Sequence, residues 1–465
     1  MDKIEKTIEF VKDLASKFGA EDNEKRKDYI FRRNIGKENE EDDGAYYFGF
    51  IDPEEGNSGP FRDLSFVIFP DKKDGPWLVV LGIGTQGFNK DTEIAATPGL
   101  RRLFKSITSK EGFVKTSFID IETPLPKEFQ AKLPNLNQSL KKYDKYLPSC
   151  EIIKDPTSKE GQDKIAAYLA AYASEHCRRW ANNRAQRELI EESISKMRKD
   201  KKVDDEKEII NLLKERKYVV LQGAPGTGKT RMAKIVANKM DAKIFFTQFH
   251  AETDYSDFIQ GIRPATNKDN LTYQEHLGIL TKAVEFAKQN PKKNTVLIID
   301  EINRANLSNV LGEAFYLFEY TRNEGKIDME YSSENLKGEI PDNFFVISTM
   351  NTADRSLAIV DFALRRRFGW YTLKPKLIDD EKFKVGMKDF KTISEIFERC
   401  ADDSELNLQP GQGYFMANND DEMKRRIKYE LMPLIKEYLL EGRLSRAKET
   451  LCQYFAERIE EDLFE

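Results

Sequence analysis

Residues 223–230, GAPGTGKT, have the types and spacing needed to bind phosphate. They fit G-x-x-x-x-G-K-[ST] and lie between an apolar run at 218–221, typical of a buried strand, and a predicted helix at 231–240. Glycines let successive backbone N–H groups turn toward a phosphate, and a helix amino terminus adds partial positive charge. The predicted nucleotide-binding residues are Gly223, Ala224, Pro225, Gly226, Thr227, Gly228, Lys229, Thr230 and Arg231.

Two side chains of this loop and two downstream acids have distinct predicted roles. Lys229 would contact the β and γ phosphates, and Thr230 would place its hydroxyl on Mg²⁺. The apolar run at 295–301, TVLIIDE, ends in Asp300, expected to hold Mg²⁺, and Glu301, expected to orient or deprotonate the attacking water. Together the two segments predict a nucleoside triphosphatase.

Polar residues follow a third apolar strand, FFVIST at 344–349. Asn351 suits a sensor that contacts the γ phosphate or its water. Farther on, ALRRRF at 363–368 contains three consecutive arginines. They either form a solvated surface or supply an arginine to the nucleotide of a neighbouring subunit. Such an arginine stabilises the transition state and raises the rate of hydrolysis by ~10³ to 10⁵. Donation in trans would require at least a dimer.

Five segments resemble the motor of the McrB family of AAA+ proteins, over roughly residues 205–440. They are GAPGTGKT, FTQFHAETDYSDFIQGIRP (246–264), LIIDEINRANLSNVLGEAF (297–315), MNTADRSLAIVDFALRRRF (350–368) and GQGYFM (411–416). MNTADRS is the most specific of these because it distinguishes this branch from other AAA+ proteins. The resemblance implies an α/β fold: an AAA+ P-loop core, with a parallel sheet between helices, and a C-terminal helical lid.

The resemblance also implies functional details that the residues alone leave open. It assigns Asp300 and Glu301 to metal and water, places Asn351, Asp354 and Arg355 in the signature segment, and makes Arg366 and Arg367 a trans-acting pair. It implies GTP as the nucleotide, although the spacing does not distinguish GTP from ATP. It further implies a hexameric ring, a partner McrC-like nuclease subunit, and DNA carrying modified bases.

At 465 residues the chain is too long for one ordinary core. We expect an α+β recognition domain at 1–150, a solvated helical connector at 151–204, a nucleotide-binding subdomain at 205–374 and a helical lid at 375–465. Pro433 is expected to kink a lid helix or mark its boundary.

In the first region, short apolar runs predict strands at 45–52, 64–70, 77–84 and 116–122, with a helix at 100–107. Gly82, Gly84 and Gly87 form G-x-G-x-x-G, which we assign to a turn because no helix begins at Gly87. Candidate DNA contacts are Arg101, Arg102, Lys105, Lys110 and Lys115 for phosphates and Tyr46, Tyr47 or Trp77 for base stacking. Core packing is the alternative for each aromatic residue. Arg178, Arg179, Arg184 and Arg187 form a second candidate phosphate-contacting cluster.

The net charge of −5 argues against a nucleic-acid-coating protein, but it leaves a local basic face possible. The four cysteines are scattered, which predicts a reduced interior and no zinc site. The chain shows neither a signal peptide nor a stretch long enough to span a membrane, so we expect a cytoplasmic protein. Neither a metal-ligand cluster nor a nuclease constellation is evident, so cutting is assigned to the partner.

Two other functions remain open at this point. The chain could be a MoxR-like ATPase that remodels a protein client bound by the N-terminal region, although MNTADRS and FIQGIRP weigh against it. The N-terminal region could also be an adaptor that docks the partner. In the segment 246–264, Tyr255 and Phe258 are channel or packing residues, and His250 is interpreted as structural.

Overall fold

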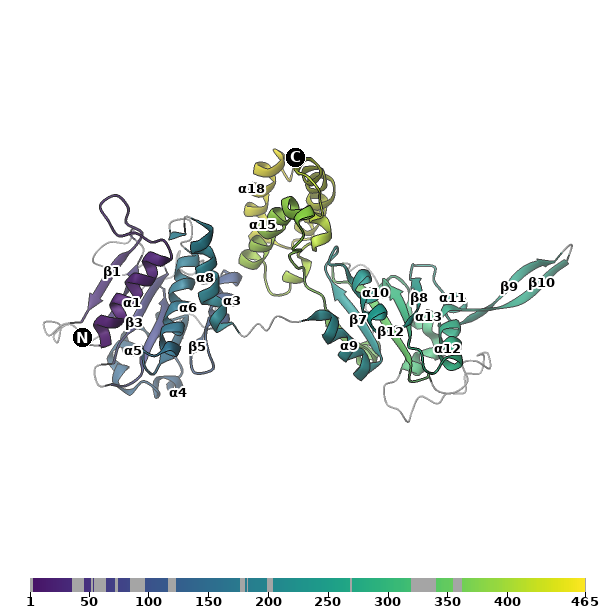
Figure 1. The fold of residues 1–465 in the computed structure, drawn as a ribbon, viewed down its shortest axis with the longest axis horizontal. Helices are drawn as coiled ribbons and strands as arrows, with labels where there is room; N and C mark the ends of the chain where they lie inside the picture. The colour runs from purple at the N-terminus through teal and green to yellow at the C-terminus, as the bar shows by residue number, and fades with distance from the viewer. Residues whose placement is uncertain are drawn as a thin grey trace. The chain divides into compact units, whose positions relative to one another are not determined.

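The computed structural model describes residues 3–35, 46–51, 53, 64–71, 74–83, 97–115, 123–175, 180–181, 183–198, 204–267, 270–318, 340–353 and 362–464. The chain divides into two compact units, Met1–Lys201 and Lys202–Glu465 (Figure 1). Within the described residues, every helix is too short or too polar to cross a membrane.

Unit 1 is built on a six-stranded antiparallel sheet in the order β1-β2-β3-β4-β6-β5. The strands are β1 (Ile30–Asn34), β2 (Tyr47–Ile51), β3 (Ser65–Phe69), β4 (Trp77–Gly82), β5 (Phe113–Val114) and β6 (Ser149–Ile153). Strands β2, β3 and β4 lie where the apolar runs predicted them. Strand β1 lies outside the apolar runs that predicted strands, because its pairing with β2 comes from the tertiary fold.

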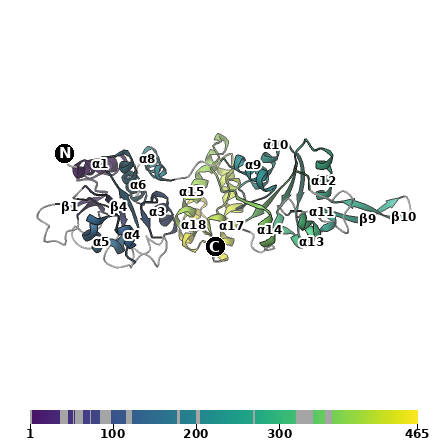
Figure 2. The same cartoon turned by 90° about the horizontal axis from the view of Figure 1, so that it is seen from below.

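Helices cover both faces of this sheet (Figures 1 and 2). They are α1 (Lys3–Lys17), α3 (Pro98–Ile107), α6 (Lys159–Glu175) and α8 (Arg184–Met197) on one face and α4 (Lys127–Gln130) and α5 (Asn137–Tyr143) on the other. Side chains of β4 alternate between the two cores, Val79 facing the first and Val80 the second. Both faces are therefore buried.

The predicted boundary at residue 150 and the solvated connector at 151–204 are wrong. Strand β6 continues to Ile153 and pairs with both β4 and β5 inside the sheet. Helix α6 is the central helix of the first core, with Leu169 and Ala170 completely buried. Its alanines are buried in this core, a packing that helical periodicity alone could not distinguish from a solvated helix.

Unit 2 contains a five-stranded parallel sheet in the order β13-β7-β12-β11-β8. Its strands are β7 (Tyr218–Gly223), β8 (Lys243–Gln248), β11 (Thr295–Asp300), β12 (Phe344–Asn351) and β13 (Gly369–Thr372). Helices α9 (Asp205–Arg216) and α10 (Lys229–Lys239) pack on one face, and α12 (Ile279–Gln289) and α13 (Leu307–Leu311) on the other. Strands buried on both faces account for the continuous apolar runs in the sequence.

Two further parts complete unit 2. After the short helix α11 (Tyr255–Phe258), strands β9 (Gln260–Asn267) and β10 (Asn270–Leu277) form a hairpin that projects from the parallel-sheet core (Figure 1). Beyond α14 (Phe362–Arg367) and β13 comes the lid, α15 (Lys384–Cys400), α16 (Asp420–Arg426), α17 (Met432–Leu440) and α18 (Lys448–Ile459), with its own core. Pro433 is tolerated in the first turn of α17, directly after a π-helical turn at Ile427–Leu431.

Candidate nucleotide site

The predicted nucleotide residues meet at the carboxyl edge of the parallel sheet. The P-loop (residues 223–230) follows β7, the two acids end β11, and Asn351 ends β12 directly opposite Gly223 in the strand register. Parallel α/β sheets bind ligands at this edge because the loops and helix amino termini gather there. The loop needs Gly226 and Gly228 for its shape, since both have positive φ values of 77° and 83°.

Lys229 is the central cation of the site. Its side chain is 7% exposed, and Nζ donates to the carbonyls of Gly223 and Ala224, both at 3.0 Å, and to Asn351 Oδ1 at 2.6 Å. The ammonium group is therefore held in place by three oxygen acceptors, two of them carbonyls at the start of the loop. From this position it is suited to neutralise phosphate charge.

Asp300 joins the P-loop to the neighbouring strand. One carboxylate oxygen, Oδ1, accepts the hydroxyl of Thr230 at 2.6 Å and the hydroxyl of Thr349 at 2.7 Å. Thr349 also accepts the backbone N–H of Glu301 at 3.1 Å. Thr349 was not identified from the sequence. The available signal was its position as the polar residue that ends the apolar run FFVIST.

Glu301 and Asn351 are brought together across the two strand ends. Asn351 Nδ2 donates to Glu301 Oε1 at 2.7 Å, and Arg304 lies 3.6 Å from Glu301 Oε2. Glu301 adopts a left-handed backbone conformation, with φ 55° and ψ 51°. Such a conformation is costly for a residue with a side chain and is concentrated at functional sites. A continuous hydrogen-bonded chain thus runs from Lys229 through Asn351 to Glu301.

These residues fit a nucleotide and Mg²⁺. Thr230 and Asp300 supply hydroxyl and carboxylate oxygens, the ligand types that Mg²⁺ prefers, and Lys229 supplies positive charge beside them. A bound Mg²⁺ would neutralise phosphate charge. The carboxylate of Glu301 is suited to accept a proton from a water, with Asn351 fixing its orientation.

The three arginines lie at the opposite end of the sheet. Strand β13 begins at Gly369, opposite Val219 near the start of β7, and Arg216, before β7, donates to the carbonyl of Arg366 at 2.9 Å. The arginines are therefore separated from the P-loop of the same chain by the length of β7, which is about 20 Å at the usual rise per residue of a strand. Arg366 is exposed, whereas Arg367 is only 5% exposed. The expected trans-acting pair is therefore reduced to Arg366 as the accessible side chain.

Several residues predicted from the sequence do not lie at the nucleotide site or fall outside the described part of the chain. Asp354, Arg355, Gly84, Gly87, Arg178, Arg179 and the predicted strand at 116–122 lie outside the described residues. His250 is exposed and its backbone N–H donates to Thr253 Oγ1, as in a local turn.

The candidate DNA contacts of unit 1 are only partly available. Trp77 is 3% exposed and packs edge-on against Phe48, so it is a core residue. Lys115 is buried and donates to the carbonyls of Asp144 and Lys145, which excludes it as a phosphate contact. Arg101 and Arg102 are half-buried on α3, and Lys105 and Lys110 are exposed. In the second cluster, the exposed Arg184 is ion-paired with Glu188.

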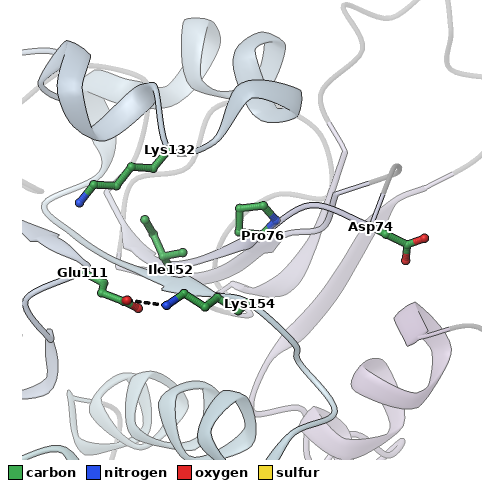
Figure 3. Close-up of a pocket in the computed structure, with 6 residues that line it drawn as sticks. All are labelled: Asp74, Pro76, Glu111, Lys132, Ile152 and Lys154. Carbon is green, nitrogen blue, oxygen red and sulfur yellow. Dashed lines mark hydrogen bonds and ion pairs between the residues drawn. The ribbon is translucent and has the colours of Figure 1, made fainter.

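The cavities among the described residues of unit 1 include two of different size. The larger, of about 360 Å³, is lined by Asp74, Pro76, Glu111, Lys132, Ile152 and Lys154 (Figure 3). Lys154 is paired with Glu111 at 2.6 Å, and Lys132 lies across Ile152 from this pair (Figure 3). Two carboxylates balance two ammonium groups, so the lining offers no net attraction for a phosphate backbone.

The smaller cavity, of about 40 Å³, includes Tyr47, one of the candidate stacking residues. The Tyr47 ring contacts the rings of Phe69 and Tyr143, with centroids 6.4 and 6.2 Å away. In this structure Tyr47 therefore packs within an aromatic cluster.

Comparisons with known proteins bear on the class of this domain. Residues 218–368 match the family profile of the AAA domain, dynein-related subfamily. The Type IV methyl-directed restriction enzyme EcoKMcrB subunit of Escherichia coli K12 is 32% identical over 271 residues, which is 52% of this chain and 58% of that protein. The Type II restriction enzyme BsuMI component YdiS of Bacillus subtilis 168 is 28% identical over 211 residues, 37% of this chain and 60% of that protein.

A solved structure from Cytophaga hutchinsonii aligns with 17% identity over 55% of this chain and 77% of that chain, but its TM-score of 0.27 is too low to bear on the fold. The chain spans about 60% of the length of the two curated relatives it matches. The matched domain and the McrB likeness support a nucleoside triphosphatase, as predicted from the P-loop and the acids of β11. Residues 218–368 therefore form an AAA domain, and over about half of its length the chain is similar to the EcoKMcrB restriction subunit.

Proposed function

We propose that this chain is the motor of a modification-dependent DNA restriction complex, hydrolysing GTP in preference to ATP with Mg²⁺. The observation that supports it is the hydrogen-bonded chain from Lys229 through Asn351 to Glu301, beside the Thr230–Asp300 pair, in a domain similar to McrB. In this arrangement the cation, the carboxylate that orients the water and the oxygens that bind the metal would all act on the same triphosphate.

The wider assembly belongs to the same proposal. The motor works as a ring, of six subunits by analogy, with Glu301 and Asn351 acting within the subunit and Arg366 on the nucleotide of its neighbour. Asp354 and Arg355 act in the signature segment, as the McrB resemblance implies. Unit 1 recognises DNA, and a McrC-like partner subunit cuts it. Both relatives are named as components of restriction enzymes, which supports this role.

The test is hydrolysis of GTP and of ATP by the purified chain, with and without a McrC-type subunit, and with methylated or unmethylated DNA. We expect GTP turnover to exceed ATP turnover and to rise when the partner is added. ATP turnover that ignores both DNA and the partner would contradict the restriction role and favour a protein-remodelling ATPase.

Lys229→Ala tests whether this site performs the hydrolysis. Removing the ammonium leaves the β and γ phosphates without their fixed cation, so nucleotide binding should be lost. Lys234→Ala, which changes a lysine on α10 outside the P-loop, is the matched control. Normal turnover by Lys229→Ala would place the active site elsewhere.

A further inference from the structure

The lid segment 411–414, Gly-Gln-Gly-Tyr, lies directly against the P-loop. Three hydrogen bonds join the two segments: Gly411 N to Pro225 O at 2.8 Å, Gly413 N to Gly226 O at 2.9 Å, and Gln412 Nε2 to Thr227 O at 2.9 Å. Three consecutive carbonyls of the P-loop are therefore turned toward the lid.

The orientation of these carbonyls determines the orientation of the phosphate-binding groups. In a trans peptide, the carbonyl and the N–H of the same unit point in opposite directions, and the described chain contains only trans peptides. The N–H groups of Gly226, Thr227 and Gly228 must therefore point away from the lid segment. In this motif they form part of the phosphate cradle.

The contact is too close for side chains at two positions. A Cβ on Gly411 would lie 2.1 Å from the carbonyl carbon of Gly226, and a Cβ on Gly226 would lie 2.8 Å from the ring of Tyr414. On the far side, Arg426 donates to the carbonyl of Gly413 at 3.0 Å. The lid segment is thus held against the P-loop from within the lid.

The Gln412 side chain donates a hydrogen bond to the P-loop, and its amide is fixed at both ends. While Nε2 donates to Thr227 O, Oε1 accepts the backbone N–H of Lys376 at 3.1 Å, in the stretch that leads from β13 to the lid. The Lys376 ammonium pairs with Asp205, which also accepts the hydroxyl of Tyr371 at 2.6 Å. Burial, together with the hydrogen bond to Asp205, raises the pKa of Tyr371, so the hydroxyl stays protonated.

We propose that Gln412 is a positioning residue for nucleotide binding: its amide holds the Thr227 carbonyl outward so that the Gly228 N–H faces the phosphates. The inference rests on the proposed nucleotide site and adds a residue from the lid to it. It also makes phosphate affinity depend on the lid being docked.

The test compares Gln412→Leu with Gln409→Leu. Gln409 is the matched control because its amide donates to Ser394 Oγ within the lid. For Gln412→Leu we expect KM for the nucleoside triphosphate to rise about tenfold, the scale of one lost hydrogen bond to a charged-ligand cradle. We expect kcat to change less than twofold, because the cradle binds phosphate equally in the ground and transition states. Gln409→Leu should leave both parameters unchanged.

Two further measurements keep the outcomes distinct. The melting temperature of the nucleotide-free chain monitors folding, and Gln412→Asn, too short to span both partners, serves as a second variant. If both Gln412 variants fold and keep KM within twofold of wild type, the positioning role is overturned. If Lys229→Ala also binds nucleotide normally, it is the nucleotide site itself that fails. A rise in KM for both Gln412 variants, with Lys229→Ala inactive, supports the role.

Discussion

At the scale of single residues, the nucleotide site is organised by side chains that each contact two partners. The Asn351 amide accepts a hydrogen bond from the Lys229 ammonium and donates one to the Glu301 carboxylate. A movement of the Lys229 ammonium therefore alters the position of the Glu301 carboxylate through this one amide. Asp300 accepts two hydroxyls on the same oxygen. Such shared contacts fix orientation better than isolated pairs, since every partner restricts the rotamers of the others.

Glu301→Gln should bind nucleotide with near wild-type affinity but hydrolyse it about 100-fold more slowly or worse, because the amide cannot accept the water's proton. Binding is measured with a fluorescent nucleotide and turnover by phosphate release. Full-rate hydrolysis would show that Glu301 has another role.

Thr349→Val removes the hydroxyl that orients Asp300 while preserving side-chain volume. We expect the apparent affinity for Mg²⁺ to fall about tenfold, as is usual when a residue that orients a metal ligand is lost. The measurement is hydrolysis as a function of Mg²⁺ concentration. Thr372→Val is the control, since the hydroxyl of Thr372, on β13, accepts a hydrogen bond from Gln222, on β7. An unchanged Mg²⁺ dependence in Thr349→Val would exclude this role.

At the scale of elements, α6 decides where unit 1 ends. A solvated helix and a central core helix can share the same periodicity, and only the sheet that α6 covers makes its alanines interior. The same applies to the lid segment 411–414. Its glycines matter because their backbone N–H groups lie within 3 Å of P-loop carbonyls, where an added side chain would clash.

Leu169→Ala should destabilise unit 1 by about 2–5 kcal/mol, because it opens a cavity in a fully buried position. Tryptophan fluorescence during urea unfolding follows this transition, since Trp77 and Trp180 are both in that core. Leu377→Ala, at a 59% exposed leucine, is the control. Equal stability of the two variants would contradict a core role for α6.

At the scale of the whole molecule, the arginines of α14 and the nucleotide residues are at opposite ends of one sheet. A subunit of this shape cannot bring Arg366 to its own P-loop, so the proposed function requires a neighbour to supply it. Assembly would then be part of catalysis.

Mixing two inactive variants tests this arrangement. Arg366→Ala keeps its own P-loop but lacks the arginine, and Lys229→Ala keeps the arginine but lacks the cation. In a mixed ring, some P-loops of the first variant lie next to arginines of the second, so hydrolysis should recover to a measurable fraction of wild type. Arg365→Ala, with its guanidinium over the Trp370 ring, is the control and should remain active. Lack of recovery in mixtures that do assemble would contradict donation in trans.

The P-loop, the acids of β11 and Asn351 were predictable from sequence because each follows a short apolar strand, and parallel strands bring their carboxyl ends to one edge. A short apolar strand followed by a polar residue is a local pattern that is enough to predict where that residue lies on the sheet. The AAA+ core with its lid was implied by the resemblance of five segments to the McrB family, and the matched AAA domain and the parallel sheet agree with it.

Contacts between segments distant in the chain were decided only by tertiary structure. Whether α6 is solvated, whether Arg367 is accessible, and which P-loop carbonyl Gln412 contacts depend on what packs against them. Residue type and local spacing do not specify the packing partner, since the same periodicity serves a core helix and an exposed one. The sequence therefore determined the chemistry of the nucleotide site, and the tertiary structure determined which further residues hold it in position.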